Sequence, residues 1–419
     1  MVAIERIFKK ATGRWLRPIE AHDVLCHIAV CVLSGGIRRS AMIACFSPED
    51  EAMATCKSGE WWIKNSQRGK SNNSMVFIRD EISREQFDAF WAVVQANKCG
   101  EPGIILSNSR ESLYNPCVEA SLRAFSFCNL CEIDASAATD QKHLEDMVEA
   151  AAFIGTLQAG FTNFHYLRPI WRETTEEDAL LGVSLTGIAG MKDGLDLSAA
   201  ARVAVSVNEY YAKEIGIKPA ARVTCCKPAG STSLVMGSSS GVHPWHSEYY
   251  IRRIRVNKME PLCSYLMRRI PELIEDSVYD ETDAVISLPV KAVEGAITRK
   301  ETALDFLERV KRIQNTWVKG GHRRGENTHN VSATVTVKDG EWSIVADWMW
   351  NNRDCYAGLS ILPEDCGTYQ QLPFEEISEE KYLAIVEKVR GLDLTQVEEA
   401  IDNTNLSGEL SCAGGACMV

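Results

Sequence analysis

The stretch NPCVEASLRAFSFC, residues 115–128, carries an amide, a thiol and a carboxylate at alternate positions, followed by a second thiol. Residues two apart in an extended segment or loop point to the same side. Asn115, Cys117 and Glu119 are therefore expected to converge, and such a set suits a sugar, whose hydroxyls need an amide and a proton-accepting carboxylate. A turn with a buried cysteine and a solvent-facing glutamate would have the same spacing, so both interpretations stay open.

The protein is large and has a modest excess of acidic over basic residues. The 419 residues can bury a sizeable core, and 57 Asp and Glu outnumber 45 Lys and Arg. No basic patch dominates, so nucleic acid is not expected as a partner. The sequence shows no secretory signal and no apolar run of the roughly 20 residues that a membrane span needs, so we expect a cytoplasmic protein without a membrane partner. In that compartment the 15 cysteines are not a disulfide framework, and a minority are candidates for catalysis.

Helical and extended patterns alternate along most of the chain. Apolar residues recur at helical spacing in seven segments: 21–33, 84–97, 141–157, 176–191, 196–214, 302–317 and 379–391. Short apolar or β-branched runs between them predict strands at 41–45, 103–106, 222–225, 284–288, 331–337 and 359–362. This alternation predicts an α/β architecture with parallel strands.

Two glycine-bearing segments offer further polar chemistry. KPAGSTSLVMGSSSGVHP, residues 227–244, presents backbone N–H groups and hydroxyls that could bind a phosphate, although an ordinary loop is the simpler interpretation. His243 and His246 lie near its end, but no third ligand accompanies them, so no metal is expected. The terminal CAGGAC places Cys412 and Cys417 on a flexible tail, where they are either a dithiol for disulfide exchange or two unpaired surface thiols.

Together and in this order, the segments resemble the catalytic subunit of ribonucleotide reductase, and most of all the adenosylcobalamin-dependent (class II) ribonucleoside-triphosphate reductases. The resemblance rests on SGGIRRSA at 34–41, NPCVE followed by CNL, PAGSTSLVMGSSSGVHP and the terminal CAGGAC. Residues 384–411 lack the tyrosine pair of class I, and the tail lacks the glycyl-radical motif of class III. Adenosylcobalamin therefore remains as the radical source.

The resemblance implies a fold and a division of the chain. The fold is part of a ten-stranded α/β barrel, made of two five-stranded parallel half-barrels around a central finger loop. Residues 1–114 would end the first half-barrel. Residues 115–402 would form the finger loop and the second half-barrel with its extensions, and residues 403–419 would be a redox-active tail.

The resemblance also implies a role for each residue of the opening stretch. Cys117 would become a thiyl radical that takes the 3′ hydrogen of the ribose. Glu119 would accept the 3′-hydroxyl proton, and Asn115 would hydrogen-bond the sugar. Cys128 would be one half of a disulfide-forming pair that reduces the substrate.

The remaining segments would bind the substrate and deliver electrons. The resemblance implies a ribonucleoside triphosphate substrate, whose phosphates would be bound by Ala229, Gly230, Ser231, Thr232 and Ser233. Cys412 and Cys417 would carry electrons from thioredoxin to the oxidised Cys128 pair.

Two features depart from the family pattern. Position 229 is alanine where a hydroxyl residue is usual, which removes one phosphate ligand. More seriously, the partner of Cys128 should lie on an early barrel strand, and none of the cysteines before residue 117 matches its position: Cys26, Cys31, Cys45, Cys56 and Cys99. The N-terminal allosteric region is absent too. We therefore expect one half of a split enzyme, completed by an N-terminal partner chain. The alternatives are an inactive fragment with a nucleotide-binding or regulatory role, a class I fragment, and a plain thiol–disulfide oxidoreductase.

Overall fold

The computed structural model describes residues 2–31, 33–34, 37–38, 41–278, 281–364 and 371–398. Half of SGGIRRSA and all of the terminal CAGGAC, with Cys412 and Cys417, lie outside these ranges. The predictions made on those residues therefore stay predictions.

Five parallel strands form one part of the main sheet: β8 Asn129–Asp134, β9 Leu181–Thr186, β10 Thr224–Cys225, β14 Thr334–Val337 and β15 Gly358–Pro363. Strand β9 pairs with β8 on one side and β10 on the other, and β14 pairs with β15. A parallel bridge between Cys226 and Val331 joins β10 to the segment that enters β14.

Three further parallel strands complete the described part of this sheet: β3 Met42–Phe46, β4 Ser71–Ile78 and β5 Gly103–Ser107. Strand β5 runs antiparallel to β15, so the two parallel sets meet there with opposite directions. The predicted α/β architecture with parallel strands is confirmed. Eight strands are described where the resemblance implies ten. They form two hydrogen-bonded groups, β10-β9-β8 and β14-β15-β5-β4-β3, which the single Cys226–Val331 bridge links, so that β8 and β3 are the outer strands.

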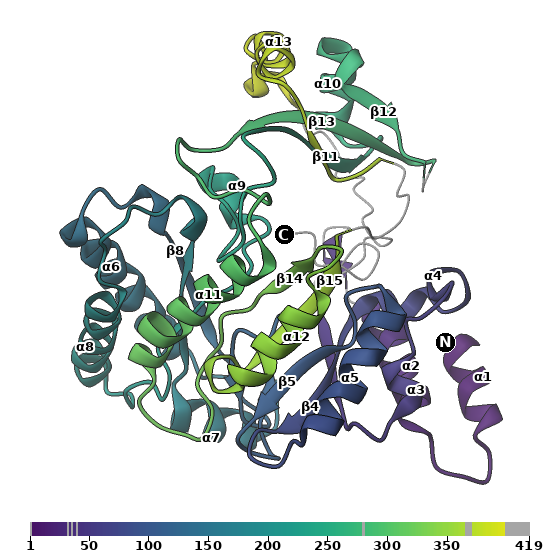
Figure 1. Cartoon of the computed structure of the whole chain (residues 1–419), viewed down its shortest axis with the longest axis vertical. Helices are drawn as coiled ribbons and strands as arrows, with labels where there is room; N and C mark the ends of the chain where they lie inside the picture. Colours follow the sequence, from purple (N-terminus) through teal and green to yellow (C-terminus); the bar gives the residue numbers. More distant parts are fainter. Residues whose placement is uncertain are drawn as a thin grey trace.

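Helices cover the outside of both sets (Figure 1). Helices α6 Gln141–Ala159 and α8 Leu197–Ile215 pack together beside β8 and β9. Helix α5 Arg84–Asn97 connects β4 to β5, and a capping box between Ser83 and Gln86 starts it. The other helices on this body are α1 Val2–Lys10, α2 Pro18–Ala29, α3 Glu51–Ala54, α4 Trp61–Lys64, α7 Pro169–Asp178, α11 Ala303–Ile313 and α12 Trp342–Asn351.

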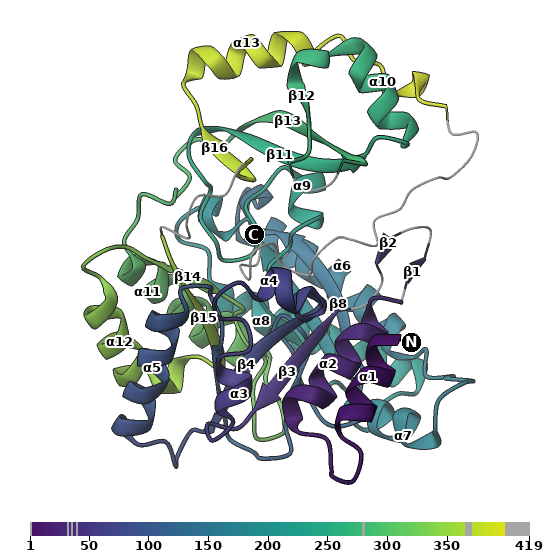
Figure 2. The ribbon, with the colours of Figure 1, turned by 90° about the vertical axis from the view of Figure 1, so that its right-hand side faces the viewer.

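A separate antiparallel layer lies above the main sheet (Figures 1 and 2). Its strands are β12 Ile274–Asp276, β13 Asp283–Lys291, β11 Tyr249–Asn257 and β16 Phe374–Glu376, in that order. Helices α10 Pro261–Arg269 and α13 Glu379–Val389 supply part of its small core. The strand predicted at 284–288 exists, but it belongs to this antiparallel layer and not to the parallel sheet.

One predicted helix is wrong. The segment 176–191 contains the end of α7, the whole of β9 and a short 3₁₀ turn at Ile188–Gly190. All six residues of β9 are buried, so the strand shows no alternation of polar and apolar residues. A fully buried strand and a buried helix look alike in such a run. The sequence analysis also missed β4, β8, β11 and α12.

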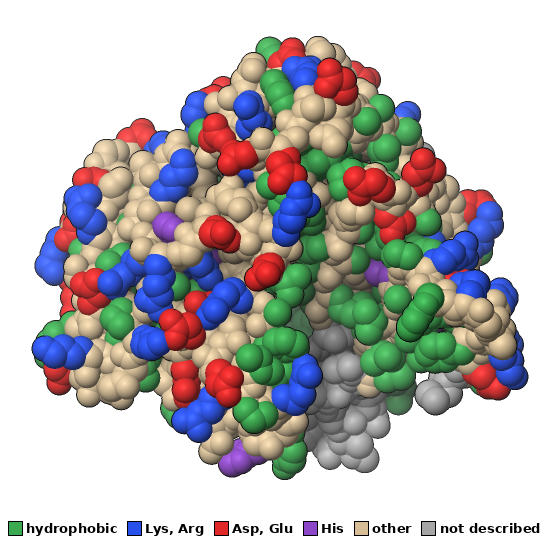
Figure 3. Space-filling view, turned by 90° about the horizontal axis from the view of Figure 1, so that it is seen from below, with side chains coloured by type: hydrophobic (Ala, Val, Ile, Leu, Met, Phe, Trp, Pro, Cys, Tyr) green, Lys and Arg blue, Asp and Glu red, His purple; other side chains and the backbone are tan. Residues whose placement is uncertain are grey.

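Charged and hydrophobic side chains are unevenly distributed over one face of the molecule. Seen from below, charged side chains spread over the outer parts of the face, and hydrophobic side chains gather toward its middle (Figure 3). Among the described residues, no helix has the length and apolar character required to cross a bilayer.

Candidate functional site

A short hairpin presents the predicted catalytic loop. Its strands are β6 Leu113–Tyr114 and β7 Ser121–Leu122, and residues 115–120 form the loop between them. The Ala120 N–H donates to Asn115 Oδ1 at 2.9 Å, and the Val118 N–H donates to the Asn115 carbonyl at 2.8 Å. Val118 has a φ of +63°. The loop is thus a tight turn, and Asn115 helps to close it.

The loop lies between the two parallel sets and is bonded to both. From β4, Asn72 Nδ2 donates to the Pro116 carbonyl at 2.8 Å. From the segment before β14, the Asn330 N–H donates to the Glu119 carbonyl at 2.9 Å. On β15, a Cβ added to Gly358 would lie 2.8 Å from Val118 Cγ1, so the loop packs closely against that strand. These contacts hold the loop between the two parallel sets, and its role as a finger loop stays a prediction.

Buried polar side chains form hydrogen bonds at and beside the base of the hairpin. His329 Nδ1 accepts from the Ser121 N–H at 3.1 Å, and His329 Nε2 contacts the Leu181 carbonyl at 2.8 Å. Burial lowers the pKa of His329 to about 3, so the ring is neutral and can accept at Nδ1 while donating from Nε2. Asn330 donates to the Gly358 carbonyl and accepts from the Ala357 N–H, both at 3.0 Å.

Glu119 is fully buried and has one charged partner. Lys227 Nζ lies 2.8 Å from Glu119 Oε1, whereas Oε2 is buried without a hydrogen-bond partner. Burial alone would lower the pKa of Lys227, but the Glu119 carboxylate outweighs it and the pKa is raised. The solvent-facing glutamate of the alternative interpretation is therefore wrong. Glu119 is a carboxylate held by a lysine, with one oxygen free for another donor.

Sequence reasoning missed Lys227, although it opens the KPAGS segment. Its N–H donates to Ser184 Oγ at 2.9 Å, which fixes it where β10 ends beside β9. Its ammonium also lies within electrostatic range of Cys117 and Cys225. A lysine directly before a phosphate-loop sequence was the available signal. Lys227 therefore interacts with two of the predicted site residues, Cys117 and Glu119.

Cys128 lies just before β8, and a second thiol that was not predicted lies near it. Cys225, on β10, is within electrostatic range of both Cys128 and Glu119. Burial raises the pKa of Cys128 to about 12 and raises that of Cys225 well above its ordinary value. The nearby Glu119 carboxylate acts in the same direction on both. Both thiols are therefore protonated at neutral pH.

Cys117 is half-buried and lines a cavity of about 50 Å³. The cavity wall includes polar groups from both parallel sets, among them Asn72, Ser332 and Thr334. Ser332 Oγ also donates to the Cys117 carbonyl, so the same element that lines the cavity holds the residue's backbone. The thiol can be reached from one side.

The predicted phosphate-binding residues form the start of a short helix, α9 Thr232–Met236. Gly230, Ser231 and Thr232 are exposed, whereas Ala229 and Ser233 are buried. Ser233 Oγ donates to the Ala229 carbonyl, so this hydroxyl closes the turn. Three of the five residues can thus face a ligand.

His243 and His246 have structural contacts. His243 Nε2 accepts from the Thr334 N–H at 3.1 Å, and the His246 ring stacks on Phe374. The described residues hold no group of three side chains suited to a metal ion.

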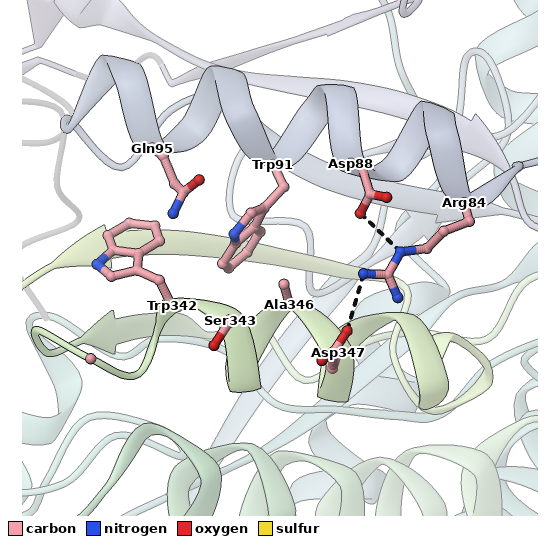
Figure 4. Close-up of a pocket in the computed structure, with 9 residues that line it drawn as sticks. Arg84, Asp88, Trp91, Gln95, Trp342, Ser343, Ala346 and Asp347 are labelled. Atoms are coloured by element: carbon pink, nitrogen blue, oxygen red, sulfur yellow. Dashed lines mark hydrogen bonds and ion pairs between the residues drawn. The ribbon is translucent and has the colours of Figure 1, made fainter.

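A larger hollow than the cavity at Cys117 lies elsewhere. A groove of about 500 Å³ runs between α5 and α12, lined by Trp91 and Trp342 (Figure 4). Arg84 bridges it, bonding Asp88 at 2.9 Å and Asp347 at 3.0 Å. None of the predicted site residues lines this groove, so the smaller cavity at Cys117 is the one that bears on the chemistry.

Comparison with known proteins agrees with the motifs. No protein-family model matches the chain. The adenosylcobalamin-dependent ribonucleoside-triphosphate reductase of Lactobacillus delbrueckii subsp. bulgaricus is 24% identical over 477 aligned residues, covering 100% of this chain and 62% of that protein. The enzyme of the same name from Lacticaseibacillus paracasei is 26% identical over 487 aligned residues, with the same coverage.

A solved structure extends the likeness to the fold. The crystal structure of a B12-dependent (class II) ribonucleotide reductase superposes with a TM-score of 0.75 at 22% identity, covering 94% of this chain and 60% of that one.

The chain is thus similar in sequence to adenosylcobalamin-dependent ribonucleoside-triphosphate reductases and similar in fold to a class II ribonucleotide reductase.

The alpha subunit of a class Id ribonucleotide reductase from Actinobacillus ureae superposes less closely, with a TM-score of 0.50 at 12% identity over 78% of this chain and 72% of that one. The resemblance predicted from the sequence motifs is confirmed. The chain spans 62% of the length of the two curated relatives described above, less than two thirds.

Proposed function

We propose that this chain forms the radical-thiol part of an adenosylcobalamin-dependent ribonucleotide reductase, which reduces ribonucleoside triphosphates to 2′-deoxyribonucleotides. The observation that carries the proposal is the position of the 115–120 loop. Both parallel sets hydrogen-bond to this loop, and its Glu119 carboxylate contacts Lys227. The names and the fold of the class II relatives support it.

The residues divide the reaction between them. Cys117, as a thiyl radical, takes the hydrogen atom from C3′ of the ribose and later returns it. Glu119 accepts the 3′-hydroxyl proton, for which its free Oε2 is suited. The 2′-hydroxyl leaves as water, while Cys128 and a second thiol lose two hydrogen atoms and form a disulfide. Lys227 is a positioning residue, because its ammonium contacts Glu119 Oε1 at 2.8 Å and leaves Oε2 without a partner.

Adenosylcobalamin would be bound beside Cys117, which is half-buried and lines a cavity of about 50 Å³. The residues that would face the cofactor's reacting end are Asn72, Ser332 and Thr334. When bound, the cofactor supplies a carbon-centred radical by homolysis of its Co–C bond. The close packing around the loop excludes water from the thiyl radical.

The substrate's triphosphate would lie at the start of α9. Exposed backbone and hydroxyl groups of Gly230, Ser231 and Thr232 offer hydrogen bonds to phosphate oxygens. Lys227 is three residues before Gly230 and adds positive charge near this end of the site.

Strands from outside these 419 residues would complete the sheet, and we propose an N-terminal reductase chain as their source. Strand β8 is mostly half-buried, whereas its neighbour β9 is fully buried, and β3 is similarly half-buried at the other end. Helix α6, which packs on β8, leaves Ile154 and Leu157 exposed. Free edges and exposed apolar side chains of this kind suit a partner that adds strands. Residues 1–114 would then complete the first half-barrel with that chain.

Electrons would come from thioredoxin through Cys412 and Cys417. Both lie outside the described residues, so this part of the proposal rests on the CAGGAC sequence and on the family resemblance. A dithiol exchanges with a disulfide through a mixed-disulfide intermediate, which is the chemistry that this transfer needs.

An activity assay tests the proposal. The chain would be co-expressed with a candidate N-terminal chain, and deoxynucleotide formation measured with and without adenosylcobalamin. We expect reduction only with the cofactor, complete loss in Cys117→Ser, and retention in Cys226→Ala, because the Cys226 thiol donates to the Leu185 carbonyl within the sheet. If Cys117→Ser changes neither reduction nor nucleotide binding, the chain is a binding or regulatory fragment.

A further inference from the structure

Resting on the proposed function, we propose that Arg252 binds the terminal phosphate of the substrate and so selects ribonucleoside triphosphates over diphosphates. This residue lies on β11, in the antiparallel layer above the main sheet. It belongs to none of the sequence motifs discussed above. Its side chain is a half-buried cation without a carboxylate partner, on the face of the layer that is turned toward the phosphate-binding segment.

The predicted phosphate-binding segment is short of positive charge. Residues 227–244 contain a single Lys or Arg, Lys227, whose ammonium already contacts the Glu119 carboxylate at 2.8 Å. The Thr232 hydroxyl is hydrogen-bonded to Glu132, a second carboxylate beside this segment. A triphosphate carries one more charged group than a diphosphate, and an arginine is well suited to bind it. The cation for that group therefore has to come from another element.

Arg252 has no carboxylate to balance its charge. Among the residues that the structure describes, it forms neither an ion pair nor a hydrogen bond, and its guanidinium lies 5.3 Å from the centroid of the Phe374 ring. Burial lowers the pKa of Arg252, and no described carboxylate acts in the opposite direction. Arg253 differs, because its guanidinium contacts both Glu275 and Glu375. Since buried charges are normally paired, the unpaired Arg252 suits an anionic ligand.

Strand register turns Arg252 toward the main body. Arg252 pairs with Phe374 on β16, and Tyr250 lies two residues before it, so the three side chains share one face of the layer. On that face, Tyr250 packs in one cluster with Trp245 and with Ala189, which follows β9 of the main sheet. The Arg252 guanidinium therefore lies on the side of the layer that faces the main sheet.

The phosphate-binding segment is attached to the same part of the main sheet. Just past β9, the Gly187 N–H donates to the Ser239 carbonyl at 2.9 Å. Ala189, two residues further on, packs against the layer face described above. Helix α9 lies below the layer in both views (Figures 1 and 2). A phosphate chain bound along residues 230–232 therefore has this layer beside it, and its far end is directed toward Arg252.

A second cation lies near Arg252. The Arg299 guanidinium is 5.5 Å from the centroid of the same Phe374 ring. Glu376, a carboxylate of the same strand as Phe374, is paired with Lys300 at 3.3 Å. Two guanidinium groups around one ring repel each other, so an anion between them is favoured. The surroundings of Arg252 thus add to its preference for a phosphate group.

This position allows the site to distinguish nucleotides by the length of the phosphate chain. A triphosphate places its third phosphate at Arg252, whereas a diphosphate ends before it. Loss of the guanidinium should therefore weaken triphosphate binding and leave diphosphate binding unchanged. The reacting groups, Cys117 and Glu119, lie at the other end of the substrate and should keep their roles.

Nucleotide titrations test the assignment on the 419-residue chain without cofactor. Each common ribonucleoside triphosphate and its diphosphate would be titrated by calorimetry into the parent, Arg252→Gln and Arg268→Gln. Arg268 is the control because it is an exposed arginine of α10 in the same layer. We expect Arg252→Gln to weaken triphosphate binding by about tenfold and to leave diphosphate binding unchanged. Arg268→Gln should bind both nucleotides as the parent does.

Further variants keep this test decisive. Equal thermal melting of the three proteins shows that they are folded, and Arg252→Met, which keeps the aliphatic stem, replaces Arg252→Gln if that variant melts early. Arg252→Lys keeps the charge without the planar fork and should retain part of the triphosphate preference. An unchanged ratio of triphosphate to diphosphate affinity in Arg252→Gln overturns the assignment. So does an equal loss of affinity for both nucleotides, which would indicate a structural effect.

A reduction assay separates this assignment from the proposed function. With the N-terminal chain and adenosylcobalamin, Arg252→Gln should raise KM for the triphosphate by about tenfold and leave kcat near that of the parent. A parent that prefers triphosphates in the titrations but reduces none would place the failure in the proposed function alone. A parent that reduces triphosphates, with an Arg252→Gln variant of the same KM, would overturn the role of Arg252 alone.

Discussion

At the scale of single residues, the site depends on a buried carboxylate with one charged partner. Glu119 is fully buried, and its Oε1 contacts Lys227 while its Oε2 has no hydrogen-bond partner. A buried charge that loses its partner is costly, because neither water nor another ion replaces it. The ion pair that positions the proposed base therefore also stabilises the fold.

Replacing Lys227 should destabilise the protein. We expect Lys227→Met to lower the free energy of unfolding by about 3 kcal/mol, measured by urea titration, because Glu119 is left buried and unpaired. Lys218→Met is the matched control: Lys218 pairs with Glu177, both side chains are about half exposed, and such surface pairs contribute under about 1 kcal/mol. Equal losses in the two variants would contradict the account.

The neutral His329 ring should make the fold sensitive to acid. Its pKa is about 3 in the folded protein and about 6.5 in an unfolded chain, so the unfolded state binds the proton first as pH falls. Stability from this ring is thus present above pH ~6.5 and is lost as the pH falls toward 3, by about 1.4 kcal/mol per pH unit.

His329→Asn removes this titration, and the Asn oxygen can still accept from Ser121. Urea titrations at pH values from 7 to 4 should show a smaller loss of stability in the variant than in the parent. His22, His243 and His246, whose pKa values are lowered to about 4 mainly by desolvation, keep part of the pH dependence of stability in both proteins. An unchanged slope would count against a neutral His329.

At the scale of elements, β9 decides how the site is assembled. It is the middle strand between β8 and β10, and Gly182 lets the residues of its two neighbours approach each other across it. The hairpin β6–β7 adds Cys117 and Glu119 from the side of the loop. Each element contributes one or two groups, and none holds the site alone.

A methyl group at Gly182 should contact side chains of both strands beside β9, Leu130 on β8 and Cys225 on β10. The added Cβ would lie 2.3 Å from Leu130 Cδ2, so Leu130 has to move. We expect Gly182→Ala to cost about 1–3 kcal/mol of unfolding free energy, measured by urea titration. Gly391→Ala, where a Cβ meets nothing within 4 Å, should leave the unfolding free energy unchanged. An unperturbed Gly182→Ala would show that the strands are not this closely packed.

At the scale of the whole molecule, the main sheet has two parallel sets and two free ends. The described order ends at β3 on one side and β8 on the other. The antiparallel layer that contains β11 and β13 lies above this sheet and leaves its order unchanged (Figure 2). A partner that adds strands should therefore act on the two end strands.

Amide hydrogen exchange should locate that partner. On addition of the N-terminal chain, we expect slower exchange in Met42–Phe46 and Asn129–Asp134, because new ladder hydrogen bonds would form there. Leu181–Thr186 is the internal control, since β9 already pairs on both sides and should stay protected throughout. Binding without added protection in β3 or β8 would place the partner elsewhere.

Much of the site could be predicted from short stretches of sequence. NPCVE, CNL and the glycine-rich loop led to Cys117, Glu119 and Cys128, and the helix at 84–97 agrees with the structure to the residue. Such features are local: a periodic apolar face or a motif is complete within about twenty residues. The sequence by itself therefore determined the α/β class, the family resemblance and the members of the proposed catalytic loop.

Only the tertiary structure decided which groups stand together. The Lys227–Glu119 pair joins residues 108 positions apart, and Cys225 approaches Cys128 across a third strand, β9, that the local pattern assigned to a helix. Strand register sets these contacts, and the register follows from burial on both faces of a sheet assembled from distant segments. Local spacing does not contain that information, because the packing that selects the register forms only when the segments meet.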